Sequence, residues 1–347
     1  MEGMALLQEA PHFVFYGPSR FRADVPERLC ELYVLRDHPI YSLREQFLFP
    51  EMLRHRSLFH SPHYNIPLRF RGKLVVNIHD LNHLLFPENL PSALHRLYAR
   101  YMFKEAAIRA AHIITSSENT RKEIMKHLRV DPARVSVLPL AISERFQPCE
   151  DKEEIEDFQR ENRLPGRYLF TIGINKPHKN FPFLVQTLAR LWGSNKLDIP
   201  LVIGGMKKDG RKDLESLIEE CRVADKVIFV HRLPYLELPK IYAGAEALIF
   251  PSRYEGFGLP PLEAMKTGVP VIASNRPPIP EVVGDAGIYF DPTSGEELST
   301  ALERVLYDSN LRSQLIQKGR QNLGRFSWIE NAKRTCEIYR RVLDKES

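Results

Sequence analysis

The chain has 347 residues, of which 43% are hydrophobic and 27% charged, and its formal net charge is +5. This length suffices for two domains of ordinary size, and this composition is typical of a globular protein rather than a disordered or fibrous one. No apolar run approaches about 18 residues and no basic leader precedes a long apolar core, so we expect neither a membrane span nor a secretory signal.

The cysteines and the charges narrow the class further. The four cysteines are scattered without a C-x-x-C pair, which disfavours a zinc site or a disulfide framework and agrees with a cytoplasmic location. Residues 1–147 hold 20 basic and 15 acidic side chains, and the remainder holds 29 of each. A basic first domain favours an anionic membrane or a lipid phosphate as a partner, although a solvated basic surface explains it equally well. No basic stripe interleaved with aromatic residues is present, so no nucleic-acid partner is expected.

Short apolar segments alternate with longer helical ones over residues 1–147, which we take as the first domain. The helical patterns are clearest over residues 92–110 and 120–127. The predicted strands cover residues 12–17, 32–35, 58–62, 73–80, 112–117 and 135–140. This alternation is typical of an α/β fold with a parallel sheet, so the domain is predicted to be Rossmann-like.

An acidic polar stretch over residues 148–166 is predicted to be a linker with a short helix, and a second α/β set follows over residues 167–325. The strands predicted in this set cover residues 167–173, 199–205, 226–230, 246–251, 270–274 and 287–292. A final helix is predicted within residues 326–347. Ligands of such sheets bind at the carboxyl ends of the strands, so the residues that follow each strand are the candidates for a site.

Two glutamates eight positions apart, Glu255 and Glu263, follow the apolar strand-like segment 247–250. The loop between them contains Gly256 and Gly258, and the prolines at 260 and 261 suit the first turn of a helix that carries Glu263. A glycine loop that leads into a helix N-terminus binds anions well. Carboxylates beside it would repel phosphates, so we interpret them as acceptors for the hydroxyls of a nucleotide sugar. The alternative is an ordinary strand–turn–helix with two solvated glutamates.

The run Pro251–Gly287 resembles the retaining glycosyltransferases of family 4, in which E-x7-E marks the donor site. The Gly-Phe-Gly-Leu sequence between the two glutamates and the Gly-Val-Pro-Val-Ile-Ala sequence after them both fit the family. The resemblance implies the GT-B architecture: two Rossmann-like parallel-sheet domains that face each other across a cleft. It also implies that the helix of residues 326–347 packs back toward the first domain.

The beginning of the chain departs from the family pattern. Family members open with a strand and a Gly-Gly-x-Gly type loop, whereas this sequence begins with a predicted helix over Met1–Glu9 that runs into the counterpart of the second strand. We expect either that the true start lies upstream or that this unit has been lost, which would leave a strand edge uncovered.

The segment Thr171–Phe181 resembles the family's loop after the first strand of the second domain. The resemblance gives Lys179 the role of clamping the diphosphate, and Gly173 lets the backbone approach it. Many members carry an arginine directly after that glycine, where this chain has Ile174. Asn175 and Lys176 follow and are included in the donor site, with Lys176 as a substitute cation.

The remaining donor contacts also follow from the resemblance. Glu255 would hold the hydroxyls of the transferred sugar, Glu263 would accept from the ribose, and the main chain near Leu233 would meet the nucleobase. The expected glycine is replaced by His231 there, so the identity of the base is left open. Backbone N–H groups of the motif loop would contact phosphate or sugar; these belong to Gly256, Phe257, Gly258 and Leu259.

In the first domain, His79 matches a histidine that the family places near the donor sugar, and we include it with Glu255 and Lys179 among the catalytic residues. Asp80 and Arg121 are assigned to the acceptor side. The serines at 116 and 117 suit a helix N-cap. Because the sequence lacks a convincing D-x-D motif and two-domain glycosyltransferases generally work without a bound metal, no metal or other cofactor is expected.

One helix is a candidate for membrane contact. Over residues 95–111 the basic residues Arg96, Arg100 and Lys104 fall at positions i, i+4 and i+8, with apolar residues nearby. This pattern is typical of a helix that lies on a membrane surface, and also of a solvated helix on an α/β sheet. The first alternative would place the protein at the inner face of the cell membrane.

The sequence therefore predicts a retaining transferase that moves a hexose from a nucleotide sugar to a hydroxyl of a glycan or lipid-linked acceptor in polysaccharide biosynthesis. The Lys-Pro-His-Lys-Asn segment resembles bacterial mannosyltransferases, so GDP-mannose is the first expectation for the donor and UDP-glucose the second. Two alternatives stay open: a sugar-nucleotide epimerase on the same architecture, and a degenerate protein that binds a nucleotide sugar without catalysis.

Overall fold

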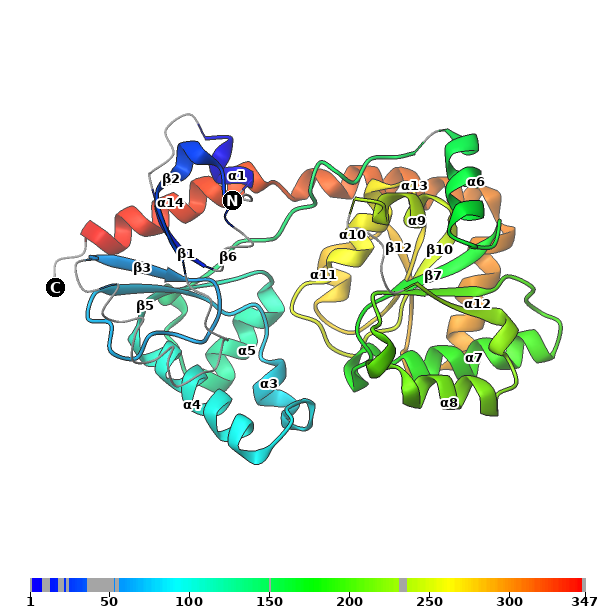
Figure 1. The fold of residues 1–347 in the computed structure, drawn as a ribbon, viewed down its shortest axis with the longest axis horizontal. Coiled ribbons are helices and arrows are strands. Elements are labelled where there is room, and N and C mark those ends of the chain that lie inside the picture. The colour runs from blue at the N-terminus through cyan, green and yellow to red at the C-terminus, as the bar shows by residue number, and fades with distance from the viewer. Residues whose placement is uncertain are drawn as a thin grey trace. The chain divides into compact units, whose positions relative to one another are not determined.

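The computed structural model describes residues 2–7, 13–17, 22, 25–35, 53, 56–149, 151–230 and 236–344. The chain divides into two compact units (Figure 1). Unit 1 consists of residues 1–140 and 327–347, and unit 2 consists of residues 141–326. The chain thus leaves unit 1, forms the whole of unit 2, and returns to complete unit 1 with its last helix.

The strands of unit 1 form two sheets in which every pairing is parallel. One sheet pairs β1 with β2, and the other has the order β3-β4-β5-β6. We predicted one set of strands here; within the described residues the first two strands pair only with each other. The strand bounds are β1 Phe13–Gly17, β2 Cys30–Leu35, β3 Leu58–Ser61, β4 Lys73–Asn77, β5 Ala110–Thr115 and β6 Val135–Val137.

Helices lie on both faces of the four-stranded sheet of unit 1 (Figure 1). Successive strand residues point to opposite faces, so Leu74 and Val76 of β4 enter the core under α4 and α5, while Val75 packs against α14. The helix bounds are α1 Glu2–Ala5, α3 Asn82–Leu85, α4 Ala93–Arg109, α5 Glu118–Leu128 and α14 Trp328–Asp344. A strand flanked on both faces explains why β4 is apolar throughout its interior.

The ends of the helices in unit 1 follow capping chemistry. The side chain of Ser92 accepts a hydrogen bond from the backbone N–H of His95 at the start of α4, and Ser117 does the same for Thr120 at the start of α5. The predicted opening helix is shorter than expected, since α1 ends at Ala5. It lies so close to α14 that a Cβ atom at Gly3 would fall 1.8 Å from the carbonyl oxygen of Trp328, so only glycine fits there.

Unit 2 contains one parallel six-stranded sheet with the order β12-β11-β10-β7-β8-β9. Counted from the first strand of this unit, the order is 3-2-1-4-5-6, which is the classical dinucleotide-binding arrangement. The strand bounds are β7 Tyr168–Ile172, β8 Leu201–Gly204, β9 Val227–Val230, β10 Ala245–Phe250, β11 Val271–Ser274 and β12 Gly287–Phe290. Each lies within two residues of its predicted range.

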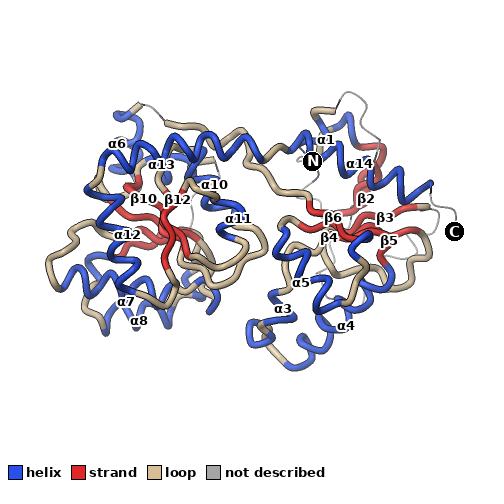
Figure 2. The backbone as a smooth tube through the Cα atoms, turned by 180° about the vertical axis from the view of Figure 1, so that it is seen from behind, coloured by secondary structure: helices blue, strands red, loops and turns tan. Residues whose placement is uncertain are grey.

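Helices cover both faces of this sheet as well. Figure 1 shows α7, α8 and α12 on one face and α9, α10 and α11 on the other, and Figure 2 shows the same layers from behind. The core between the sheet and the first group of helices is built from aliphatic side chains such as Leu169, Ile203 and Leu188. The helix bounds are α6 Lys152–Glu161, α7 Phe181–Gly193, α8 Lys212–Glu220, α9 Leu238–Ala243, α10 Leu259–Lys266, α11 Ile279–Val283, α12 Gly295–Tyr307 and α13 Ser309–Asn322.

The segment 148–166, predicted as a linker, contains α6 and belongs to unit 2. The side chain of Asp151 caps this helix, and Glu154 forms an ion pair of 2.8 Å with Lys240 on α9. None of the described helices combines the length and the apolar character that a membrane span requires.

Candidate functional site

The order of the strands in unit 2 reverses between β7 and β10. The connections from β7 run outward through β8 to β9, and the chain then returns to place β10 on the other side of β7. At such a reversal the loops at the carboxyl ends of the two strands diverge and leave room for a ligand. The loop after β7 carries Gly173 to Lys179, and the loop after β10 carries Glu255 and the glycines of the motif.

The loop after β7 begins with Gly173, which adopts a backbone conformation that favours glycine. The backbone N–H of Gly173 donates to the carbonyl of Gly204 over 3.0 Å, and its φ of +152° lies in a region that favours glycine. A short 3₁₀ turn follows over Pro177–Lys179 and ends at Asn180, whose φ is +61°. Asparagine tolerates this left-handed conformation better than most residues, so the loop can turn sharply into α7.

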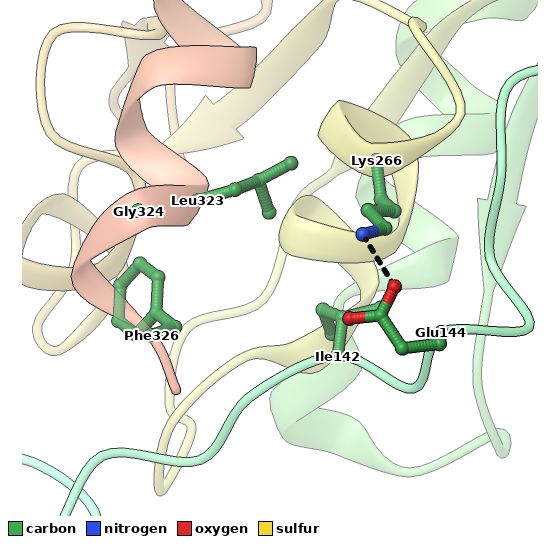
Figure 3. Close-up of a pocket in the computed structure, with 6 residues that line it drawn as sticks. All are labelled: Ile142, Glu144, Lys266, Leu323, Gly324 and Phe326. Atoms are coloured by element: carbon green, nitrogen blue, oxygen red, sulfur yellow. Dashed lines mark hydrogen bonds and ion pairs between the residues drawn. The ribbon is translucent and has the colours of Figure 1, made fainter. Parts of the chain in front are cut away.

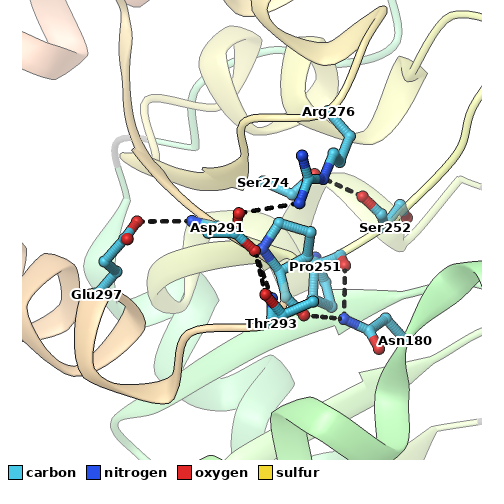
Figure 4. Close-up of polar contacts among 9 residues, drawn as sticks. Asn180, Pro251, Ser252, Ser274, Arg276, Asp291, Thr293 and Glu297 are labelled. Atoms are coloured by element: carbon cyan, nitrogen blue, oxygen red, sulfur yellow. Dashed lines mark hydrogen bonds and ion pairs between the residues drawn. The ribbon is translucent and has the colours of Figure 1, made fainter.

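Asn180 ties the loops of three strands together (Figure 4). Its amide nitrogen donates to the carbonyl of Pro251, which follows β10, over 3.2 Å and to the carbonyl of Pro292, which follows β12, over 2.8 Å. The side chain is 3% exposed, so these are buried hydrogen bonds. The loop that carries Lys179 is therefore held in a fixed position relative to the loop that carries Glu255.

A second polar network fixes the loops after β11 and β12 (Figure 4). Arg276 forms an ion pair of 2.9 Å with Asp291, and Asp291 also accepts hydrogen bonds from the backbone and the side chain of Thr293. The hydrogen bonds from Thr293, and to a smaller extent the ion pair with Arg276, hold the pKa of Asp291 below its usual range. The hydroxyl of Ser274, the last residue of β11, donates to the carbonyl of Ser252 in the loop after β10.

The two residues predicted to act on the donor lie against each other at the reversal point. The Nζ atom of Lys179 is 2.6 Å from Oε1 of Glu255, and 16% and 12% of the two side-chain surfaces are exposed. The ammonium also lies 5.7 Å from the ring centroid of Phe250 at the end of β10. A partly buried cation beside a carboxylate, at the carboxyl ends of two diverging strands, is suited to bind a group that is both anionic and rich in hydroxyls.

The motif loop is shaped by Gly258, which precedes α10 with a φ of +102°. Pro260 and Pro261 lie in the first turn of this helix, as predicted. The ring of Phe257 is buried and meets the ring of Phe326 edge-on, with centroids 5.8 Å apart. The Phe257 side chain therefore packs the loop against Phe326. In Phe257, as in Gly256 and Leu259, the backbone N–H group is the candidate for ligand contact.

Glu263 lies on α10 and makes a different contact from Glu255. The hydroxyl of Tyr242 on α9 donates to Oε2 of Glu263 over 2.6 Å. Burial raises the pKa of Glu263, and the hydrogen bond from Tyr242 opposes this effect. The motif glutamates thus have different environments, since one carboxylate is paired with a cation and the other is buried beside a phenol.

The other predicted donor residues lie in the same loops, with one exception. Asn175 and Lys176 precede the 3₁₀ turn and are partly buried. Ile174, which stands where many family members have an arginine, is 55% exposed. Leu233, the predicted nucleobase contact, lies outside the described residues.

In unit 1, His79 follows β4 and lies among other histidines. Burial lowers the pKa of His79, while Asp80 and a hydrogen bond to the backbone of Pro62 raise it. Burial, and after it the nearby His79 and His83, lower the pKa of His63 to about 4 against the opposing effect of Asp80. Neutral imidazoles therefore gather at the carboxyl end of this sheet, where they can donate or accept hydrogen bonds without adding charge.

The predicted acceptor-side residues have structural partners as well. Asp80 accepts a hydrogen bond of 2.8 Å from the backbone N–H of Asn82 at the start of α3. Arg121 on α5 forms an ion pair of 3.4 Å with Glu118, and its Nε atom is buried without a hydrogen-bond partner. Thr120, next to Arg121, donates its hydroxyl to the carbonyl of His79 over 3.4 Å. The hydrogen bond from Thr120 thus places Arg121, the next residue on α5, near His79 and Asp80.

A separate hollow of about 260 Å³ lies in unit 2 at the other end of α10 (Figure 3). It contains none of the predicted site residues, and its main polar feature is an ion pair of 3.2 Å between Lys266 and Glu144. Its lining consists of Ile142, Glu144, Lys266, Leu323, Gly324 and Phe326. The described residues contain no group of three or more metal-ligating side chains that could hold an ion.

Two residues of the site escaped the sequence analysis. Asn180 stands before Phe181-Pro182, a pattern that predicts a helix N-cap, and only the fold shows that its side chain reaches two distant carbonyls instead. Tyr242 lies in a short helix with an ordinary apolar pattern, so no sequence signal sets it apart from a core tyrosine. Both act through partners more than 20 residues away in the chain.

Comparison with known proteins identifies the family of the chain. Residues 10–146 match the family described as Glycosyltransferase Family 4, and residues 152–322 match the family described as Glycosyl transferases group 1. The O-antigen chain mannosyltransferase B of Escherichia coli is 31% identical over 82% of this chain and 74% of its own length. The O-antigen chain mannosyltransferase RfbU of Salmonella typhimurium is 28% identical over 72% of this chain and 65% of its own length, just under two thirds.

The fold recurs in solved structures. The crystal structure of HepE from Anabaena in complex with UDP-glucose has a TM-score of 0.75, with 17% identity over 93% of this chain and 89% of that chain. Similarity at this level of identity supports the fold, and the relative from Escherichia coli supports the family. The chain therefore belongs to glycosyltransferase family 4, and it is a glycosyltransferase with the GT-B fold.

Proposed function

We propose that the protein transfers mannose from GDP-mannose to a hydroxyl of a glycan or lipid-linked acceptor in the biosynthesis of a surface polysaccharide, with retention at the anomeric carbon. The names of the O-antigen mannosyltransferases from Escherichia coli and Salmonella typhimurium support the sugar and the pathway. UDP-glucose is the second candidate donor, supported by the complex of HepE. The single observation that carries the proposal is the Lys179–Glu255 pair at the strand reversal of unit 2.

Lys179 would stabilise the leaving group. When the bond between the anomeric carbon and the diphosphate breaks, negative charge develops on the diphosphate, and a cation already in place stabilises it without reorganisation. Lys179 is the cation at this position, with Lys176 three residues before it in the same loop. Backbone N–H groups of the motif loop would complete the contacts, because that loop leads into the N-terminus of α10.

Glu255 would hold the sugar. Its carboxylate can accept from sugar hydroxyls and stabilise positive charge that develops at the anomeric carbon as the diphosphate departs. We assign His79 a further contact with the sugar as a neutral hydrogen-bond partner, since burial lowers its pKa. Glu263 would accept from the ribose of the donor. The acceptor oxygen would then attack the anomeric carbon on the face that the diphosphate leaves, and the proton of the acceptor hydroxyl would pass to the departing diphosphate.

Helix α4 supports a location at a membrane surface. Leu94, Leu97, Tyr101 and Ile108 are 73%, 67%, 46% and 61% exposed. At about 100° per residue these four side chains fall within a sector of about 60° on the helix, which we call the apolar stripe. Arg100 and Lys104 are exposed along one edge of it. An apolar stripe beside basic residues suits the interface of a membrane that contains anionic lipid, where a lipid-linked acceptor would be found.

A thermal-shift panel tests the donor assignment. The purified chain is melted with GDP, UDP, ADP and dTDP in turn, and a ligand at a hundred times its dissociation constant should add about 2.7 kcal/mol of stability. We expect GDP to give the largest shift. A shift with UDP alone would replace GDP-mannose by UDP-glucose, and no shift with any of the four would contradict the nucleotide site. Anomeric proton signals of the product from GDP-mannose then test retention.

A further inference from the structure

Only one of the two oxygens of the Glu263 carboxyl group accepts a hydrogen bond from the residues that the structure describes. The residue is 9% exposed, and Oε2 accepts from the hydroxyl of Tyr242 over 2.6 Å. Among the residues that the structure describes, no group donates to Oε1. A carboxylate can accept several hydrogen bonds, and a buried one is costly unless it receives them. Oε1 of Glu263 can therefore accept a hydrogen bond from a ligand.

Tyr242 is held more rigidly than a surface phenol. Its side chain is fully buried, with ring-centroid distances of 4.9 Å to Phe170 and 6.0 Å to Phe146. The neighbouring carbonyl of Ile241 accepts from the hydroxyl of Tyr168 on β7 over 2.7 Å, which ties α9 to the sheet. The position of the Tyr242 hydroxyl is consequently set by the core of unit 2 and not by the loops around the site.

The backbone of Glu263 is fixed from the other side. Its neighbours on α10, Leu262 and Ala264, are fully buried, and its carbonyl accepts from the hydroxyl of Thr267 over 3.0 Å. What remains free in Glu263 is the rotation of the side chain itself. The hydrogen bond from Tyr242 removes that freedom by anchoring one oxygen, which determines where the other oxygen lies.

We propose that Tyr242 is a positioning residue for recognition of the donor's ribose, because it holds Oε2 of Glu263 so that Oε1 accepts a hydrogen bond from a ribose hydroxyl. This inference rests on the proposed function, since it takes the ligand to be a nucleoside diphosphate sugar. A deoxyribose analogue would leave Oε1 buried and without a donor. Sites built in this way reject the analogue that lacks the hydroxyl much more strongly than sites that merely enclose it.

The test measures how well the protein distinguishes ribose from deoxyribose. Dissociation constants of GDP, 2′-deoxy-GDP and 3′-deoxy-GDP are determined by calorimetry for the wild type, Tyr242→Phe, Glu263→Gln and the double variant. We expect the wild type to prefer GDP over one of the analogues by about tenfold or more, and Tyr242→Phe to reduce this preference to about threefold or less. In the Glu263→Gln background, Tyr242→Phe should have no further effect on the preference.

Tyr168→Phe is the matched control. It removes a buried phenol hydrogen bond of similar length that ends on the same helix but does not involve Glu263. We expect it to lower the melting temperature about as much as Tyr242→Phe while it keeps the wild-type preference for GDP. This pair of variants separates a positioning effect from a loss of stability.

The outcomes distinguish the inference from the proposed function. If the wild type binds none of the nucleoside diphosphates with any base, the proposed function fails. If it binds GDP or UDP but Tyr242→Phe keeps the full preference for ribose, or the wild type has no preference, the positioning role is overturned while the donor site stands. Should Tyr242→Phe fail to fold, Glu263→Gln is compared with the wild type instead. If Glu263→Gln keeps the wild-type preference for ribose, the inference is overturned.

Discussion

Lys179 and Glu255, which the sequence separates by 75 residues, are joined by an ion pair of 2.6 Å between Nζ and Oε1. Each residue follows a different strand, and the two strands are neighbours at the centre of the sheet. In the proposed mechanism the diphosphate and Glu255 would both attract the same ammonium group. The carboxylate would thus orient the lysine before the donor arrives, and the arriving diphosphate would free the carboxylate to accept from the sugar.

Replacing Glu255 by glutamine should abolish most of the transfer and preserve the fold. The amide keeps the shape of the side chain but loses the charge that stabilises the reacting sugar, so we expect the turnover rate to fall by about 10²–10³-fold. Initial rates of GDP release with acceptor, together with a thermal melt, measure both effects. A variant with near-wild-type turnover would remove Glu255 from the catalytic assignment.

Glu246→Gln is the matched control for this variant. Glu246 lies at the opposite end of the same strand, β10, and is also ion-paired, at 2.6 Å with Arg167 and 3.2 Å with Arg312. Losing it should lower stability without changing the turnover rate. If both variants lose activity equally, the effect of Glu255→Gln reflects a general weakening of unit 2.

Asn180→Ala should destabilise unit 2 by about 1–3 kcal/mol, because it removes two buried hydrogen bonds and leaves the carbonyls of Pro251 and Pro292 without this donor. Urea unfolding followed by circular dichroism measures the loss. Asn195→Ala is the control for the cost of placing alanine in a left-handed backbone conformation. Asn195 also has a positive φ, of +54°, but its side chain is exposed. Equal costs at the two positions would show that the buried hydrogen bonds of Asn180 contribute nothing.

The histidines of unit 1 should make the protein sensitive to acid. The pKa of His63 is about 4 in the folded state and about 6.5 in the unfolded state, so the unfolded chain binds more protons between these values. Protonation therefore favours unfolding: the stabilisation is complete above pH 6.5 and is lost as the pH falls toward 4, by up to about 3 kcal/mol. His63→Gln should flatten the dependence of the melting temperature on pH between 7 and 4. The same change at the exposed His127 should leave the dependence as steep as in the wild type.

The apolar stripe of α4 predicts binding to vesicles. The wild type should sediment with vesicles that contain anionic lipid, and less so as salt is raised, because the basic edge is screened. Arg100→Glu combined with Leu97→Ser should abolish sedimentation, whereas Lys208→Glu combined with Lys212→Glu, at exposed positions of unit 2, should not. Equal binding to vesicles of neutral lipid would exclude the electrostatic part of the proposal. Self-association through the stripe would instead appear as a dimer in light scattering.

Removing metal ions should not affect transfer. In the proposed mechanism the ammonium of Lys179 supplies the positive charge that a divalent cation supplies in metal-dependent transferases. Turnover in the presence of a chelator should equal turnover in its absence, while Lys179→Met should reduce it by about 10²-fold or more. Loss of activity on chelation that is restored by a divalent cation would assign the charge stabilisation to a metal.

The sequence predicted more of the fold than of the contacts within the site. Strands such as β10 and β11 are short apolar runs bounded by glycine, proline or serine, so local chemistry alone identifies them. The pairing of Lys179 with Glu255 depends on the order of strands in the sheet, which periodicity does not encode. The contact of Tyr242 is harder still to predict. It depends on how α9 packs against α10, and a strand and a loop separate these two helices in the sequence. Contacts between residues far apart in the chain are therefore what this sequence does not reveal.

The return of the chain to unit 1 has a consequence for biosynthesis. Helix α14 completes the second face of the sheet in unit 1, where Ile338 and Val342 cover Val75 and Ile114, and Asn331 donates to the carbonyl of Pro139 over 2.9 Å. Unit 2 is continuous in sequence, so it can fold as soon as its last residue leaves the ribosome. Unit 1 needs helix α14, which follows the whole of unit 2, so the nascent protein exposes an uncovered apolar sheet face until α14 has been synthesised.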